Sequence, residues 1–476
     1  MWLVTTFLLM AVTQTHADYP ALQAVLSQKG LQKASHWATD WLQNELSKIK
    51  LPEVRGSVDI FLGSVYYVLY DMTIARCDLP EPSVAFSEGT GVSLKVNGLS
   101  LAITGHWNTE FGLIHDGGWF DLAIYTINLN TLLEFESTEE HLSIYTVTCY
   151  ADVEGIQLNF HGGGSFIFQP FVESFSGKIK DMIQEKICPG FEKGIENIDK
   201  ALAASDTIRL DPYVYLNVSL TDPPIVFDNG FELNVKGEFY SISSPSEPPF
   251  SPNHFNLPWQ ADYMLSVGMS EFCVNSAAFA YHSSGVLNIT INDGMIPKVS
   301  PIHLNTSQFG ILIPQLPKLY PDMEMEVVLY ASDTPLISFS QTVINVNLSA
   351  AAKFYALKTD TDLIALFRLD MQYSFNAKVH IEHQLLKGVL EMKNLTILLG
   401  SSEIGKFDIA PIERMVKLAM STFVLPKLNA QLQNGLPLPR VKGFSMINSV
   451  MSIENGFLFV VTDVNSPFDF LQSNKL

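Results

Sequence analysis

The sequence predicts an α+β protein of two similar halves, each with long apolar helices lying on a highly twisted antiparallel sheet. Two observations predict this class. Stretches with apolar residues at helical spacing alternate with long regions of short β-like runs. The order helix, strands, helix and further strands occurs on both sides of a proline-rich segment. A sheet that wraps a long helix without closing completely leaves an elongated apolar cavity, which suits acyl chains better than compact polar substrates.

In the first half, apolar spacing predicts a helix over residues 20–50, and period-two runs predict many short strands over 58–168. A second apolar stripe predicts a helix over 171–204. Pro189 lies inside this stripe, and we expect the helix to bend or divide there because proline lacks the backbone N–H that a helix requires.

The second half follows residues 241–260, a proline-rich segment that we interpret as an extended, semi-rigid linker. A helix is predicted at 270–283, strands follow to about residue 400, and a last helix is predicted over 409–433, interrupted at Pro426. The predicted parts are a signal peptide at 1–17, domains at 18–240 and 261–465, the linker between them, and a tail at 466–476.

A local echo supports a duplication. Residues 229–233 read NGFEL and residues 455–459 read NGFLF, each shortly after the last helix of its half.

The N-terminus indicates secretion. An apolar run too short to span a bilayer ends in Thr15-His16-Ala17, a small-x-small cleavage pattern, so the mature chain is expected to start near Asp18. No later apolar stretch is long enough for a transmembrane anchor. Five sequons, which agree with a glycosylated secreted protein, are Asn217, Asn288, Asn305, Asn347 and Asn394.

The charge of the chain is strongly negative. The net charge is −20, and no Lys or Arg occurs between Lys95 and Lys178. Such a surface repels phosphate backbones and anionic membranes, so nucleic-acid binding is a poor hypothesis. An alternative stays open, namely that the acidity only keeps a chain with 47% hydrophobic residues in solution.

No motif supports catalysis or a metal site. The HGGG at 161–164 is typical of some esterases, but the sequence lacks the G-x-S-x-G that would supply a nucleophile. His380 and His383 lack the i, i+4 spacing of a zinc helix. The four cysteines are too few for a disulfide scaffold and contain no C-x-x-C; their three full pairings stay open. We therefore expect no enzyme activity, no metal and no cofactor other than a bound lipid.

The chain resembles the family of bactericidal/permeability-increasing protein and lipopolysaccharide-binding protein over nearly all of its mature length. The stretches that carry the resemblance, in matching order and spacing, are SQKGL (27–31), NELSKIKLP (44–52), VKGEFYS (235–241), PPFSP (248–252), GVLNITINDGMIPK (285–298) and VLPKLNAQLQNGLPLP (424–439).

The resemblance implies an elongated boomerang of two pseudo-symmetric lipid-binding barrels joined by a central sheet, each with an apolar pocket for phospholipid. It implies a disulfide between Cys149 and Cys188. Cys77 and Cys273 lie off the disulfide positions and are expected to be buried thiols, with a pair between them left open. The residues that we expect to line lipid pockets are Val25, Leu26, Phe171 and Phe175 in the first barrel and Phe272, Met415 and Leu418 in the second. The tail resembles a pocket-covering end segment of a lipid-transfer member, which makes a lid one hypothesis.

The chain departs from the family at 105–122, where lipopolysaccharide-binding members carry a cationic tip. Here the tip has His106, Trp107, His115 and Trp119 and no Lys or Arg. The histidines could form a pH-dependent anion site or be ordinary surface residues, and the tryptophans could enter a lipid interface or pack inside the barrel. We therefore expect a secreted, monomeric lipid-binding protein in innate defence against bacteria, with weakened binding of bacterial outer-membrane lipid. The alternative is an extracellular lipid carrier or transfer protein without bactericidal activity.

Overall fold

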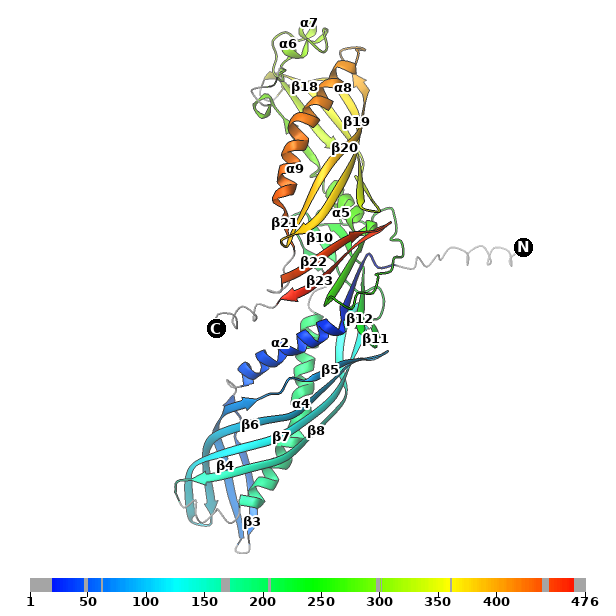
Figure 1. Cartoon of the computed structure of the whole chain (residues 1–476). Coiled ribbons are helices and arrows are strands. Elements are labelled where there is room, and N and C mark those ends of the chain that lie inside the picture. Colours follow the sequence, from blue (N-terminus) through cyan, green and yellow to red (C-terminus); the bar gives the residue numbers. More distant parts are fainter. Residues whose placement is uncertain are drawn as a thin grey trace, which may run out of the picture.

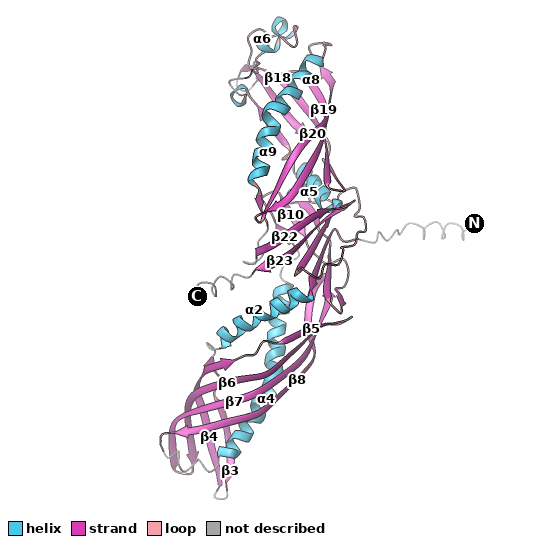
Figure 2. Ribbon diagram, in the orientation of Figure 1, coloured by secondary structure: helices cyan, strands magenta, loops and turns pink. Residues whose placement is uncertain are grey.

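The computed structural model describes residues 19–46, 50–60, 63–163, 172–203, 207–296, 300, 302–359, 362–438 and 445–465. The predicted signal peptide and C-terminal tail lie outside these residues. The chain forms an elongated boomerang in which two lobes, each a helix-backed sheet, meet at a central sheet (Figures 1 and 2). Among the described helices, none is both long and apolar enough to cross a membrane.

The N-terminal lobe is a seven-stranded antiparallel sheet in the order β2-β4-β6-β7-β8, with β3 paired to β4 and β5 paired to β6. Its strands are β2 Lys50–Leu51, β3 Val54–Ile60, β4 Gly63–Asp78, β5 Ser83–Ser87, β6 Gly91–Phe111, β7 Ile114–Thr138 and β8 His141–His161. Its helices are α2 Gln28–Leu46 and α4 Val172–Leu202. The predicted strand region is confirmed.

The inner face of this sheet packs against α4. Buried side chains alternate along the strands, and the core that they form includes Trp107, Phe120 and Leu158. Helix α4 adds Ile179, with the half-buried Ile183 beside it. The inner face of the sheet, formed mainly by the long strands β4, β6, β7 and β8, thus packs on one amphipathic helix.

The predicted division of the second helix at Pro189 is wrong, because α4 runs through this position as one element. Pro189 and Glu185, whose carbonyl loses its helical partner there, are both exposed. Water can therefore satisfy that carbonyl, and the helix tolerates the proline.

The central sheet has six strands in the order β11-β12-β1-β14-β23-β22. They are β1 Leu22–Ser27, β11 Ile225–Phe227, β12 Gly230–Val235, β14 Leu265–Ser270, β22 Ser445–Ile453 and β23 Phe457–Asn465. A smaller sheet beside it contains β9 Thr207–Arg209, β10 Val214–Asn217 and β13 Glu238–Ser241.

The central sheet is symmetric about the β1–β14 pair. The two NGF motifs open equivalent strands, β12 and β23, which flank that pair. The Ser27 N–H donates to the Met264 carbonyl at 3.0 Å, and the Ser270 N–H donates to the Ala21 carbonyl at 2.9 Å. After each serine a helix starts, so both the strand-to-helix junction and its hydrogen bond occur twice. This repetition supports the duplication that the sequence echo indicates.

The predicted helix over 20–50 needs a correction, because Leu22–Ser27 form strand β1 and the helix starts only at Gln28. Burial alternates with period two along this strand. Pairing with β12 on one side and β14 on the other satisfies its backbone, and this tertiary context outweighs the helical spacing of the apolar residues.

The C-terminal lobe is a seven-stranded sheet in the order β15-β16-β18-β19-β20-β21, with β17 paired to β18. Its strands are β15 Asn288–Ile291, β16 Met325–Ala331, β17 Leu336–Ser340, β18 Val343–Thr359, β19 Asp362–Glu382, β20 Leu385–Ser402 and β21 Leu436–Pro437. Its helices are α5 Glu271–Ser283, η2 Asp293–Met295, α6 Thr306–Phe309, α7 Leu316–Leu319, α8 Ala410–Ala419, the π-helical turn η3 Met420–Val424 and α9 Leu425–Asn434. The predicted helices at 270–283 and 409–433 are confirmed, and the interruption lies directly before Pro426.

The proline-rich segment 241–260 has little regular structure beyond β13, yet it does not run free between the lobes. Phe255 is buried and stacks on Phe457 of β23 with ring centroids 5.0 Å apart. Phe250 contacts Phe272 of α5 edge to face at 5.8 Å. These contacts fix the segment along the central sheet.

Candidate functional site

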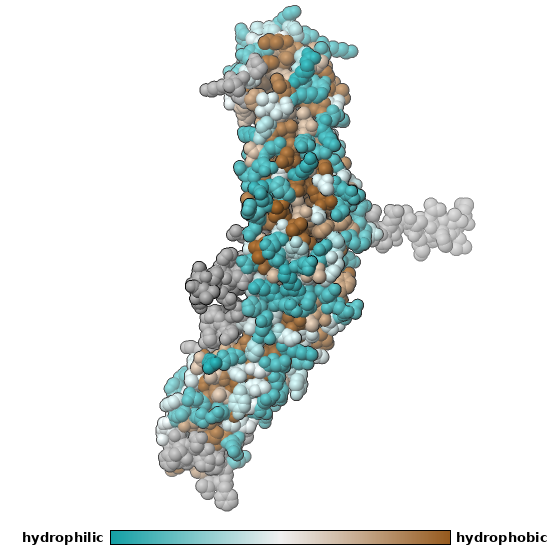
Figure 3. Space-filling model, viewed as in Figure 1, coloured by the Kyte–Doolittle hydropathy of each residue, from teal (hydrophilic) through white to brown (hydrophobic). Residues whose placement is uncertain are grey.

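An apolar cavity of about 710 Å³ lies in the C-terminal lobe, between the helical layer α8–η3–α9 and the inner face of the sheet. Figure 3 shows hydrophobic side chains gathered along this lobe, on the face that carries the two helices. The cavity walls come from β16, β18 and β19, from the helical layer, and from the loop around η2. This position, between a twisted sheet and its covering helix, is where incomplete closure was expected to leave space.

Small and flexible side chains make the space. Ala352 of β18 and Ala419 at the end of α8 line the cavity where larger residues would fill it. Among the remaining lining residues are four methionines, Met295, Met371, Met415 and Met420. Because methionine has three rotatable bonds and a polarisable sulfur, such a wall adapts to ligands of different shape.

The π-helical turn η3 sets the shape of the helical wall. It joins α8 to α9 just before Pro426, which has no N–H to donate into a regular helix. The wider turn brings Met420, Phe423 and Val424 to the cavity. The side chains of Phe423 and Val424 are 39% and 40% exposed, so they form the apolar rim of the cavity rather than part of a buried core.

Contacts of Asp293 hold the wall of the cavity that is formed by the chain around η2. One carboxylate oxygen of Asp293 in η2 accepts from the Leu304 N–H at 2.7 Å and lies 3.0 Å from Nδ1 of His303. Between these two ends the chain supplies Ile296 and Ile302 to the cavity wall. Asp293 therefore joins the chain at η2 to the chain at Leu304, and the described residues Ile296 and Ile302 between them line the cavity.

Polar groups are few in the cavity. Burial raises the pKa of Tyr373, so this phenol stays neutral, and its hydroxyl donates to the sulfur of Met371 at 3.3 Å. Ser300 and Gln431 add neutral polar groups. Among the described lining residues, Lys427 carries the one formal charge, and it is exposed, at the mouth. An apolar interior with one cation at its mouth fits an amphipathic molecule that carries a phosphate or carboxylate at one end.

The three residues predicted to line the second pocket lie in different places in the structure. Met415 lines the cavity. Leu418 does not line it and is 61% exposed, so that assignment is wrong. The cavity side of the helix is centred between Val416 and Ala419, and at 100° per residue Leu418 lies more than 100° away from that centre. Phe272 lies elsewhere, buried beside Cys273 near the central sheet, and does not reach the cavity.

The first-pocket residues also need correction where they can be placed. Val25 and Leu26 were predicted on a helix face but lie in strand β1 of the central sheet. Val25 borders a shallow hollow with Trp259, and Leu26 packs against a small cluster around Phe231. Phe171 and the side chain of Phe175 lie outside the described residues, so their lipid contacts stay predictions.

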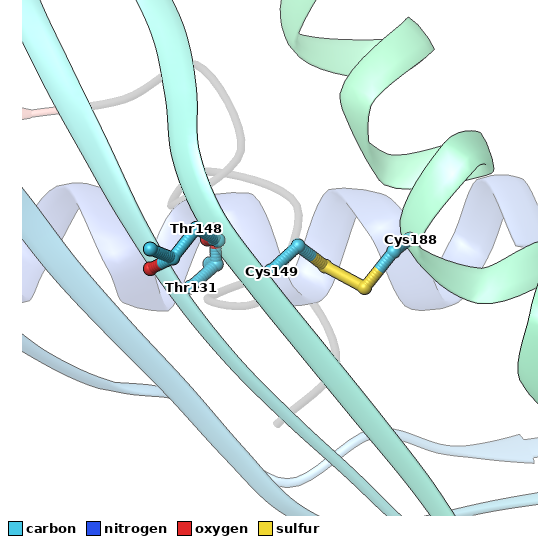
Figure 4. Close-up of a disulfide and its surroundings, with 4 residues drawn as sticks. All are labelled: Thr131, Thr148, Cys149 and Cys188. Atoms are coloured by element: carbon cyan, nitrogen blue, oxygen red, sulfur yellow. Dashed lines mark hydrogen bonds between the residues drawn. A yellow bond between two sulfur atoms is a disulfide. The ribbon is translucent and has the colours of Figure 1, made fainter.

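The implied disulfide is present. Cys149 of β8 and Cys188 of α4 are bonded, with Cα atoms 5.8 Å apart, and they fasten the helix to the sheet (Figure 4). Beside the bridge, the Thr131 hydroxyl donates to the Thr148 carbonyl at 2.9 Å and joins β7 to β8. Cys77 and Cys273 are buried thiols in different clusters, which excludes a bond between them.

The tip is the β6–β7 hairpin at the far end of the N-terminal lobe (Figure 1). Trp107 is only 1% exposed, and its indole N–H donates to the carbonyls of Trp119 at 3.1 Å and His161 at 3.3 Å. Trp119 lies on the outer face, 48% exposed. His106 and His115 also lie on the outer face. The two tryptophans thus have opposite roles, Trp107 inside the barrel and Trp119 on its surface.

Neither the HGGG run nor the pair His380 and His383 forms a catalytic or metal site among the described residues. His161 of the HGGG run contacts Asp121 at 3.1 Å, and no serine nucleophile adjoins that pair among the interactions of the described residues. His380 lies in strand β19, and His383 follows it in a turn. In the described part of the chain no group of three His, Cys, Asp or Glu side chains could hold a metal ion.

The five sequons differ in accessibility. Asn288, Asn347 and Asn394 are exposed, whereas Asn217 and Asn305 are half-buried. The side chain of Asn217 accepts from Ser219, and that of Asn305 caps helix α6. Glycosylation stays a prediction, and it is better supported at the three exposed positions.

Comparisons with known proteins agree with this architecture. The chain matches the models of the LBP/BPI/CETP family, N-terminal domain over residues 30–198 and C-terminal domain over residues 208–466. It is 30% identical over 461 residues to a bactericidal permeability-increasing protein of Sebastes schlegelii, covering 96% of this chain and 98% of the relative. It is 25% identical to human lipopolysaccharide-binding protein, covering 97% of each chain. A crystal structure of lipopolysaccharide binding protein matches the fold with a TM-score of 0.57 at 23% identity, covering 94% of this chain and 99% of that one. The chain belongs to the LBP/BPI/CETP family.

Proposed function

We propose that this chain is a secreted protein that holds a phospholipid or a similar amphipathic lipid in the C-terminal cavity. The acyl chains occupy the space under α8 and α9, and an anionic headgroup lies at the mouth beside Lys427. The observation that carries the proposal is the cavity itself, which has a volume of about 710 Å³, is apolar inside, and has Lys427 as the one charged residue among the described residues of its lining.

The energy available from such a cavity is sufficient for retention. Each methylene moved from water into an apolar site contributes about 0.8 kcal/mol, so ten buried methylenes contribute about 8 kcal/mol before the cost of association. A compact polar substrate would find almost no hydrogen-bonding groups here, because Tyr373 already donates to a sulfur. The lining therefore selects for long apolar chains.

The chain is not an enzyme. Members of the family bind lipids and are not catalysts, and the cavity is a binding site for a ligand that stays chemically unchanged. Its mechanism is sequestration: the apolar part of the ligand leaves water while the headgroup remains near solvent. We expect no covalent step.

Relatives named for bactericidal action and for lipopolysaccharide binding support a role in extracellular defence against bacteria. One observation favours a second candidate, a lipid carrier or transfer protein. The sequence has no Lys or Arg between Lys95 and Lys178, and the N-terminal tip at 105–122 lies within this stretch. The tip hairpin therefore lacks the cations that would pair with lipid phosphates. Salt-sensitive nanomolar binding to lipid A would support defence through endotoxin, whereas absence of that binding with phospholipid in the purified protein would support the carrier.

The cavity can be tested with two neighbouring substitutions. Ala419→Trp places a large ring in the cavity, whereas Leu418→Trp places the same ring on the exposed side of α8. Lipids extracted from both purified proteins are quantified by mass spectrometry, with circular dichroism as the check on folding. We expect lipid occupancy to fall at least tenfold in Ala419→Trp and to stay at the wild-type level in Leu418→Trp. Equal occupancy in all three proteins would contradict the proposed site.

A further inference from the structure

The end of the N-terminal lobe exposes an aliphatic pair. Leu113, in the turn between β6 and β7, is 98% exposed, and the adjoining Ile114 is 59% exposed. Gly112 beside them has φ +59°, a backbone conformation that makes the turn tight and pushes the pair outward. Two large aliphatic side chains at the extreme end of a lobe cost solubility and contribute nothing to its core, which is typical of a surface that enters an apolar phase.

A row of aromatic rings crosses the outer face behind this pair. Tyr70, His106, Trp119 and His161 occupy paired positions on β4, β6, β7 and β8. The rings of Tyr70 and His106 are stacked with centroids 5.6 Å apart, and those of Trp119 and His161 at 3.9 Å. Four neighbouring strands thus carry one row of rings on the outer face, in two stacked pairs.

Carboxylates lie beside this row of rings. Asp71 lies 4.0 Å from Nδ1 of His106, and Asp121 lies 3.1 Å from Nε2 of His161. Between this row and the aliphatic pair lies a hollow of about 560 Å³, and Glu110 and Asp116 are among the residues that line it. Four carboxylates therefore lie in or beside the row of rings and the hollow.

The hollow also has an aromatic wall, because Tyr66 borders it and is 60% exposed. Arg55 of β3 lies opposite Val68 of β4, which borders the hollow, and it is paired with Glu53 at 2.8 Å. This face therefore offers aromatic rings and carboxylates to a ligand, and the neighbouring guanidinium of Arg55 already has a carboxylate partner.

We propose that this tip docks on a bilayer whose surface consists of choline headgroups. Leu113 and Ile114 enter the boundary of the acyl chains. The quaternary ammonium groups meet the carboxylates of the hollow and the exposed sides of the Tyr66 and Trp119 rings.

The chemistry selects this occupant. A quaternary ammonium has no N–H to donate, so ring faces and nearby carboxylates are its natural partners. In a zwitterionic bilayer the ammonium lies outermost, and it therefore meets the acidic face first. An anionic bilayer would be repelled by the same carboxylates at distances up to the Debye length, about 8–10 Å at physiological salt. The aliphatic pair explains why a bilayer is favoured over a soluble cation.

Vesicle sedimentation with the full chain tests the proposal. We expect binding to phosphatidylcholine vesicles at least tenfold tighter than to phosphatidylglycerol vesicles. The double variant Leu113→Gln, Ile114→Gln should lose at least tenfold in affinity for phosphatidylcholine, and Trp119→Ala at least threefold. Leu398→Gln, which removes a leucine that is 59% exposed on the C-terminal sheet, should bind as the wild type does.

Each other outcome overturns the proposal. Equal binding to both vesicle types would show that charge complementarity plays no part. Unchanged binding by the double variant would show that the aliphatic pair does not enter the bilayer. Binding of free phosphocholine as tight as that of vesicles would indicate a soluble ligand, and binding of a Lys-rich peptide without vesicles would indicate a cationic protein partner. Vesicle binding by Ala419→Trp separates this surface from the cavity, because that variant leaves the tip intact.

Discussion

Breaking the bond between Cys149 and Cys188 should lower the free energy of unfolding of the N-terminal lobe by about 4 kcal/mol. The bond closes a loop with a sequence separation of 39 residues. The chain-entropy relation gives about 13 cal/mol/K for a loop of this length, which is about 4 kcal/mol at 25 °C. Both cysteines are half-buried, so the change to serine adds little cavity cost. The loss should therefore come almost entirely from the freedom gained by the unfolded chain.

The assay is urea unfolding of Cys149→Ser, Cys188→Ser against wild type, followed by hydrogen exchange of peptides from α4 and β8 to assign the affected lobe. Protection should fall in these two elements, which the bond joins, and stay constant in β18 and β19. Dithiothreitol is the matched control, because it should destabilise the wild type by a similar amount and leave the double variant unchanged.

A double variant that unfolds within about 0.5 kcal/mol of wild type would refute the reasoning, since the loop-closure term would then be absent. So would a loss of protection spread evenly over both lobes, because the bond lies within one of them.

Three further outcomes follow from single contacts. Trp107→Phe removes a buried indole N–H that serves two carbonyls, and urea unfolding should show a loss of about 2–4 kcal/mol. Gly30→Ala would place a methyl group 2.5 Å from the Met264 carbonyl oxygen, so the same assay should show about 1–3 kcal/mol lost to overpacking. Donation from the Tyr281 hydroxyl at 2.7 Å holds the pKa of Asp211 below its usual range. A depressed carboxyl pKa contributes stability that is fully present above the unfolded value of about 3.9. The advantage of wild type over Asp211→Asn in thermal unfolding should therefore be constant from pH 7 to 5, begin to decline near pH 4, and be lost as the pH falls through the lower pKa of the folded state.

Long periodic segments were predictable because one face of each had to be buried. The helices at 171–204 and 409–433 and the strand-rich region before the first of them follow directly from apolar spacing. Strand β1 was not predictable in this way. Val25 and Leu26 fit both a helical stripe and a strand, and only the flanking strands β12 and β14, distant in sequence, decide between the two.

The candidate site shows the same limit on a finer scale. Apolar spacing identifies α8 but does not fix which side of it faces the cavity, so Met415 and Leu418 looked equivalent. At the tip, strand register buries Trp107 and exposes Trp119, and a one-residue slip would reverse both. The prediction for the tip named only histidines and tryptophans and did not include Leu113. Its position beside a turn glycine indicates an exposed hairpin end and could have identified it.

The duplicated architecture supports different roles for the two lobes. In the N-terminal lobe, α4 packs its isoleucines on the sheet and is fastened to β8 by the disulfide. In the described part of the C-terminal lobe the corresponding helical layer has no such bond; it contains a π-helical turn and Ala419, and it stands over open space. A fastened helix resists the separation from its sheet that ligand entry requires, whereas an irregular helix over a methionine-lined wall permits it. The C-terminal lobe is thus suited to hold lipid, and the N-terminal lobe is suited to present a rigid tip at the other end of the molecule. If this division is correct, dithiothreitol should change vesicle binding through the tip more than it changes the lipid content of the cavity.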